Sequence, residues 1–194
     1  MVEPQLSQKA VEGFAQAALY DQHRPSYPDE AVTALLEAAK LIGLDAASLV
    51  DLAAGTGKFT EALAARPERF RTLAVEPHAQ MREQLARKNL DDVTVAEGYS
   101  TAIPAASETI DAVFVAQAFH WFANRESLHE IHRVLKPLGV LGLIWNAEDC
   151  TSWPHFFFSL PNRPFNHHHM FIAAAHTINS ISSTLFHLFP SLSF

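Results

Sequence analysis

The chain has 194 residues, 48% hydrophobic and 18% charged, so it can form one domain with a packed core. Its 14 Lys and Arg against 21 Asp and Glu give a net charge of −7, which argues against a duplex-DNA binder and against attraction to an anionic membrane. The single cysteine, Cys150, excludes an internal disulfide. Since no apolar leader follows Met1 and no run of about 20 apolar residues occurs, we expect a cytoplasmic protein without a membrane span.

The composition changes abruptly near residue 150. Residues 151–194 contain one charged residue, Arg163, and no glycine, but eight of the 14 Phe and six of the 11 His. A folded domain normally carries charges on its solvated surface. We therefore expect residues 1–150 to form the functional domain and residues 151–194 to be an atypical tail outside its fold, such as a translated intron or an altered reading frame. In this tail we expect a short helix around Ile172–Ile181 and no strand pair, although the tail can instead cover an exposed sheet edge.

The first 150 residues alternate between strand and helix patterns. Helical spacing of apolar residues predicts helices at Ser7–Ala18, Asp29–Leu44, Lys58–Ala65, Ala79–Lys88 and Arg125–Leu135. Short apolar runs predict strands at Ser48–Leu52, Thr72–Val75, Val93–Val95, Ile110–Ala116 and Gly139–Trp145. Strands that are continuously apolar are typical of a parallel sheet covered on both faces. The order predicts an α/β fold with a doubly wound, mostly parallel sheet, whose ligand binds at the carboxyl ends of the strands.

One strand-to-helix loop carries most of the functional information. Gly55 and Gly57 permit a tight turn and the close approach of a ligand, in front of a helix N-terminus. Phe59 stands where a P-loop needs Ser or Thr, and Thr60 occupies the third glycine position of a dinucleotide fingerprint, so the first is excluded and the second fits in part. Asp51, which precedes the turn, would repel a pyrophosphate but suits the cationic S-adenosylmethionine. A nicotinamide cofactor and a turn without a ligand stay open as alternatives.

A second acid supports the same cofactor. Glu76 ends the next strand, 19 residues after Gly57, where a carboxylate can accept both hydroxyls of a ribose. Together these segments resemble class I S-adenosylmethionine-dependent methyltransferases. Motif I of that family, D-x-G-x-G-x-G, is matched by Asp51–Phe59 with Ala53 in place of the first glycine. Three further segments resemble its later motifs: Ala74–Pro77, Asp111–Trp121, and Arg133–Gly139, where Leu138 replaces a glycine of R-V-L-K-P-G-G.

The resemblance is sharper to one branch of this family. Tyr20–Pro28 and Gln117–Phe122 look like the small-molecule branch that includes methyltransferase type 11 and trans-aconitate-methyltransferase-like proteins. The resemblance implies a Rossmann-like domain over residues 1–150. Because it stops near Cys150, where the family adds two further strands, it also implies a sheet that is incomplete at its C-terminal edge.

The resemblance implies a role for each candidate site residue. Cofactor binding is expected from residues of the loops and of the N-terminal lid: Tyr20, Arg24, Asp51, Ala53, Gly55, Gly57, Glu76, Ser100 and Gln117. Asp51 would bind the methionine end, Glu76 the ribose, and Ser100 the adenine side. His120 and Trp121 are expected on the substrate side as catalytic residues, since an imidazole can orient a carboxylate or accept a proton. The alternatives are structural: a capping carboxylate for Asp51, a solvated strand end for Glu76 and a surface ion pair for Arg24. For His120 and Trp121 the alternative is a structural pair, with Trp121 filling the core.

We expect methyl transfer from S-adenosylmethionine to a small organic acceptor, a carboxylate or another oxygen nucleophile, without nucleic-acid or membrane partners. No metal site is expected, because the consecutive His167–His169 cannot all face one ion on a regular element. Two alternatives remain: a non-catalytic, truncated methyltransferase-like protein, and a nicotinamide-dependent oxidoreductase.

Overall fold

The computed structural model describes residues 26–147 and 169–175. Their elements, in chain order, are α3 (Asp29–Ala38), β1 (Ser48–Leu52), α4 (Lys58–Ala64), β2 (Arg71–Val75), α5 (Ala79–Arg87), β3 (Val93–Ala96), β4 (Ile110–Ala116), the 3-10 helix η1 (Phe119–Trp121), α6 (Arg125–Val134), β5 (Leu135–Ala147) and β6 (His169–Ala175). The helix expected over Ser7–Ala18 lies outside the described residues. Within those residues, no helix is long and apolar enough to cross a membrane.

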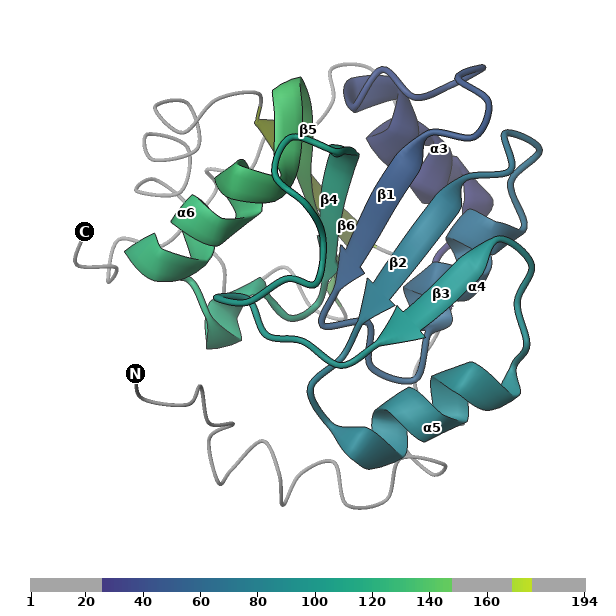
Figure 1. Ribbon diagram of the computed structural model, residues 1–194. Helices are drawn as coiled ribbons and strands as arrows, with labels where there is room; N and C mark the ends of the chain where they lie inside the picture. Colours follow the sequence, from purple (N-terminus) through teal and green to yellow (C-terminus); the bar gives the residue numbers. More distant parts are fainter. Residues whose placement is uncertain (1–25, 148–168, 176–194) are drawn as a thin grey trace.

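The strands form one sheet in the order β3-β2-β1-β4-β5-β6 (Figure 1). The first five strands pair in parallel, and only β6 runs antiparallel to its neighbour β5. From β1 the chain builds outward to β2 and β3 on one side and to β4 and β5 on the other. The doubly wound, mostly parallel α/β sheet predicted from the sequence is therefore confirmed, with its switch point between β1 and β4.

Helices cover both faces of this sheet, as the continuously apolar strands predicted. In β1, the neighbouring residues Leu49 and Val50 point to opposite faces and belong to separate buried clusters. Val50 packs in the cluster that α6 completes with Ile131. Leu49 packs in the cluster that α3 completes with Leu35 and α4 with Phe59. The two cores fix the sheet between its helices, which is the Rossmann-like arrangement.

Helix α3 ends earlier than its apolar spacing predicted. The helix expected over Asp29–Leu44 stops at Ala38, because Lys40 takes a left-handed conformation with φ of +58°. The amide of Leu41 then donates to the carbonyl of Leu36 over 2.9 Å, the pairing of a Schellman motif. A lysine at this position gives no sequence signal for a helix end, whereas a glycine would have done so.

The tail contributes a strand, where a helix was expected. β6 pairs with β5 in a register that runs from Leu141 opposite Ala175 to Ala147 opposite His169. The helix predicted around Ile172–Ile181 is therefore wrong over residues 172–175, and so is the expectation that the tail gives no strand pair. Over these residues the tail covers the edge of β5. The backbone donors and acceptors of that edge, which would otherwise be free to pair with another chain, are therefore paired with β6.

Candidate functional site

The candidate site lies where the strands of the sheet end. β1 and β2 end at Leu52 and Val75, and β4 ends next to β1 at Ala116. Loops from neighbouring parallel strands meet at this edge, so Asp51, Glu76 and Gln117 belong to one end of the sheet. The arrangement at the carboxyl ends of β1, β2, β3 and β4 can be followed in Figure 1.

The turn after β1 is built from residues in left-handed conformations. Ala53, Gly55 and Gly57 have φ of +61°, +59° and +86°. The turn is bonded to the end of β2, because the amide of Ala54 donates to the carbonyl of Val75 over 3.1 Å. At Gly57 a Cβ would overlap the Cδ1 atom of Leu85, so this glycine serves packing as well as conformation.

The surroundings of Gly55 are less crowded than those of Gly57. The nearest atom to a Cβ built on Gly55 is Met81 Sδ, 3.9 Å away. Its amide donates to Glu76 Oε2 over 2.8 Å, which joins the turn to the end of β2. A Cβ at Gly55 would make only an ordinary van der Waals contact, and the close approach of a ligand to this backbone stays a prediction.

Asp51 lies in β1, just before this turn, and is fully buried. Its Oδ2 atom accepts a hydrogen bond of 2.6 Å from the hydroxyl of Thr60, while its Oδ1 atom is buried and has no hydrogen-bond partner. Burial raises the pKa of Asp51 to about 7; the Thr60 hydrogen bond opposes this rise, and the charge of Glu76 adds to it. A buried carboxylate oxygen without a partner is costly, and a cationic or hydrogen-bonding ligand group would relieve that cost.

Glu76 is the second buried acid of the site, 5% exposed. Its two carboxylate oxygens accept hydrogen bonds of 2.8 Å from the amides of Gly55 and His78. Burial raises the pKa of Glu76, and these amides and the charge of Arg82 act against the rise. Since each oxygen has a further lone pair, the carboxylate can accept two more donors, such as the hydroxyls of a ribose.

The loop after β3 brings Ser100 to the same edge. The hydroxyl groups of Ser100 and Ser127 are hydrogen bonded over 2.8 Å, with Ser127 donating. On the other side of the loop, Arg82 donates to Glu97 Oε2 over 2.8 Å and to the carbonyls of Glu76 and Pro77. The loop is therefore tied both to the end of β2 and to α6.

The candidate substrate-side residues follow β4. Gln117 has φ of +64°, and its amide donates to the carbonyl of Ile144 over 2.9 Å. η1 comes next, with Phe119 buried and His120 and Trp121 exposed. The rings of His120 and Trp121 lie 5.0 Å apart at 40°. With Trp121 54% exposed, the alternative that it fills the core is wrong.

Two predicted site residues cannot be placed, and two residues without a predicted role contact the site. Tyr20 and Arg24 lie outside the described residues, so their expected roles stay predictions. Sequence reasoning assigned no role to Thr60 or Arg82, whose hydrogen bonds to the buried acid and to the loop carbonyls depend on tertiary contacts. Across the residues that the structure describes, no group of three or more His, Cys, Asp or Glu side chains is suited to hold a metal ion.

Comparisons with known proteins show which family this chain resembles. Residues 50–143 match the family described as "Methyltransferase domain". An uncharacterized methyltransferase-like protein of Schizosaccharomyces pombe is 42% identical over 133 residues, which cover 68% of this chain and 50% of that protein. A malonyl-[acyl-carrier protein] O-methyltransferase of Coxiella burnetii is 32% identical over 139 residues, which cover 71% of this chain and 47% of that protein.

The solved structures give the same result. The chain resembles a putative type II methyltransferase from Anaeromyxobacter dehalogenans with a TM-score of 0.54 and 28% identity, over 64% of this chain and 49% of that one. The chain spans about half the length of the curated relatives it matches. These matches favour a methyltransferase over the nicotinamide-dependent alternative.

Proposed function

We propose that this chain, which contains a class I S-adenosylmethionine-dependent methyltransferase domain, transfers a methyl group from S-adenosylmethionine to a small organic acceptor. The observation that carries the proposal is the buried Asp51, whose Oδ1 atom has no partner beside a glycine turn that Glu76 holds in place. Ligand-free, this arrangement leaves a buried acid unsatisfied, and a cationic amino-acid group would satisfy it.

The residues present fit this cofactor. Asp51 would bind the ammonium of its methionine end, directly or through a water, and Glu76 would accept the ribose hydroxyls. Without a side chain at Gly55, the backbone of the turn would be able to lie against the ligand. Ala53, Gly57, Ser100 and Gln117, from the same edge of the sheet, and Tyr20 and Arg24, from the N-terminal segment, are the other proposed binding residues.

The protein's task in this reaction is mainly positioning. S-adenosylmethionine, when bound, would supply a methyl group made electrophilic by its sulfonium, with a neutral thioether as the leaving group. A carboxylate acceptor needs no proton removed, so His120 would orient it through the imidazole. A hydroxyl acceptor would lose its proton to His120. Trp121 would pack beside the acceptor.

An oxygen acceptor is supported by two observations. The relative from Coxiella burnetii is named as an O-methyltransferase acting on malonyl-[acyl-carrier protein], and segments Tyr20–Pro28 and Gln117–Phe122 resemble the trans-aconitate-methyltransferase-like branch. Both names refer to carboxylic acids. We assign the reaction to residues 1–150; of residues 151–194, the strand β6 (His169–Ala175) joins the edge of this domain's sheet and supplies no proposed site residue.

A methyl-transfer assay tests the proposal. The full chain is incubated with methyl-labelled S-adenosylmethionine and a panel of mono- and dicarboxylic acids, and the label released as methanol by alkali is counted, because methyl esters hydrolyse in base. We expect base-labile label with the unaltered chain and with the exposed control Asp91→Ala, and none with Asp51→Ala. Label that resists alkali would refute a carboxylate acceptor. Binding of S-adenosylhomocysteine without any transfer would favour the non-catalytic alternative.

A further inference from the structure

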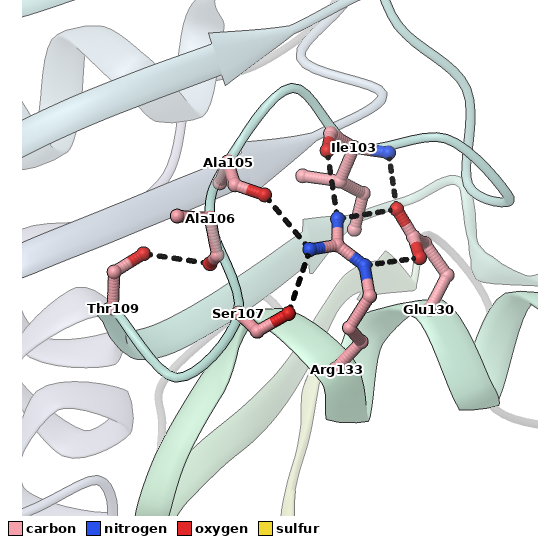
Figure 2. Close-up of polar contacts among 7 residues, drawn as sticks. All are labelled: Ile103, Ala105, Ala106, Ser107, Thr109, Glu130 and Arg133. Atoms are coloured by element: carbon pink, nitrogen blue, oxygen red, sulfur yellow. Dashed lines mark hydrogen bonds and ion pairs between the residues drawn. The ribbon is translucent and has the colours of Figure 1, made fainter.

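Helix α6 turns one polar face toward the loop that joins β3 to β4. Ser127, Glu130 and Arg133 are spaced three residues apart, so they lie on the same side of the helix. All three make hydrogen bonds to residues between 100 and 107. Figure 2 shows the far part of this contact, in which Arg133 and Glu130 point into the curve of the loop.

Glu130 and Arg133 bind each other and the loop at the same time. Arg133 donates from Nε to Glu130 Oε2 over 2.7 Å and from Nη2 to Oε1 over 2.8 Å, a bidentate pair that lowers the pKa of Glu130. Glu130 Oε1 also accepts the amide of Ile103 over 2.7 Å. Arg133 donates to the carbonyls of Ile103 and Ala105, at 3.1 and 3.0 Å (Figure 2).

At its N-terminal end, the polar face of α6 contacts Ser100, a proposed cofactor-binding residue. The hydroxyl of Ser127, which has no exposed surface, donates to the hydroxyl of Ser100 over 2.8 Å. The amide of Ser127 donates to the side chain of Asn124, the N-cap of α6, over 2.9 Å. Two backbone hydrogen bonds between Tyr99 and Ala102 close a turn. This turn connects Ser100 to Ile103, whose amide Glu130 accepts. α6 therefore fixes both the hydroxyl of Ser100 and the backbone three residues beyond it.

We infer that Ser127 and Glu130 are positioning residues for the cofactor, which hold the hydroxyl of Ser100 where the ligand binds. This inference rests on the proposed function. A hydroxyl that already accepts from Ser127 directs its own hydrogen elsewhere, so Ser100 can serve the ligand as a hydrogen-bond donor. Preorganising this group before binding lowers the entropy that the complex must lose.

A double-mutant cycle separates positioning from mere stabilisation. Binding of S-adenosylhomocysteine to the full chain is measured by calorimetry for Glu130→Ala and Ser127→Ala, each with and without Ser100→Ala. We expect each single change, Ser100→Ala included, to weaken binding about three- to tenfold. Because the first two act through Ser100, we expect no further loss when either is combined with Ser100→Ala.

Two further variants serve as controls. Glu130→Gln keeps an oxygen that can accept the amide of Ile103, so we expect it to restore most of the affinity lost in Glu130→Ala. Ser107→Ala removes an exposed hydroxyl that also accepts from Arg133, over 3.2 Å, at the far end of the loop. We expect this variant to bind like the unaltered chain.

Three results would overturn the inference alone, while the unaltered chain binds the ligand. These are full affinity in Glu130→Ala and Ser127→Ala, full affinity in Ser100→Ala, and losses that multiply in the double variants. If Glu130→Ala does not fold, the Ser127→Ala cycle decides by the same criteria. A folded, unaltered chain that does not bind S-adenosylhomocysteine would refute the proposed function and this inference with it.

Discussion

The buried acid Asp51 should make the ligand-free protein less stable as the pH rises. Its pKa is about 7 in the folded chain, against an ordinary value of 3.8, because burial disfavours its charge. Between about pH 4 and pH 7 the folded chain keeps a proton that the unfolded chain releases, so raising the pH favours unfolding. Above pH 7 both states are ionised and the difference stays constant. Roughly three pKa units at 1.36 kcal/mol each correspond to about 4 kcal/mol.

Asp51→Asn removes this titration while keeping the shape of the side chain. The amide oxygen can still accept from the hydroxyl of Thr60, so the variant should be more stable than the unaltered chain by about 2 to 4 kcal/mol at pH 8. At pH 4, where Asp51 is protonated in the folded chain, the gain should be lost. Burial raises the pKa of Glu76 in both proteins, so this contribution is common to them in the comparison.

Urea unfolding, followed at pH 4, 5, 6, 7 and 8, measures the free energy of unfolding of both proteins. The difference between them should grow from pH 4 to pH 7 and then level off. Parallel pH profiles, or a variant less stable than the unaltered chain at pH 8, would show that Asp51 is solvated or partnered and would refute the reasoning.

Three other predictions follow from the same geometry. Affinity for S-adenosylhomocysteine should rise between pH 6 and pH 8 as Asp51 ionises. Calorimetry should find that the affinity of Asp51→Asn changes less with pH; an equal change of affinity with pH in both proteins would count against the role of Asp51. Leu138→Gly should raise the free energy of unfolding by about 0.5–1 kcal/mol, because Leu138 has φ of +68°, whereas Leu138→Ala should not; equal effects in denaturation would contradict strain at this position. Once an acceptor is known, His120→Ala should lower kcat about 10²-fold or more if His120 takes the acceptor's proton, with unchanged cofactor affinity, while the exposed His129→Ala should leave both unchanged; an unaffected rate would remove His120 from the chemistry.

The sequence predicted the interior of the sheet better than its margins. β1 and β4 begin and end where their apolar runs predicted, since both lie at the centre of the sheet and are buried on both faces. β5 begins at Leu135 rather than Gly139, because an irregular register with β4 lets Leu135 pair opposite Ile110. β6 lies partly in a stretch that was expected to be helical, and its antiparallel pairing with β5 joins residues about 30 positions apart, which no local pattern indicates.

The sequence also predicted part of the candidate site. Asp51, Gly55 and Glu76 were predicted together because they lie at or just beyond the ends of neighbouring strands, whose carboxyl ends meet. Ala53 and Leu138, which replace glycines of the motifs that this sequence resembles, both have left-handed backbone conformations, and only the structure shows this.

The contacts that hold the site in place were not predictable from sequence. The hydroxyl of Thr60 reaches Asp51 across the turn, and Ser127 reaches Ser100 from a different element. No spacing rule marks such pairs, because they depend on how α6 and the loops pack against the sheet.

The most direct test of the proposed cofactor site is a calorimetric titration of the purified full chain with S-adenosylhomocysteine, beside Asp51→Ala and the exposed control Asp91→Ala. The account predicts saturable binding at one site in the unaltered chain and in the control, and its loss in Asp51→Ala. A folded chain that does not bind, or equal binding by Asp51→Ala, would contradict it.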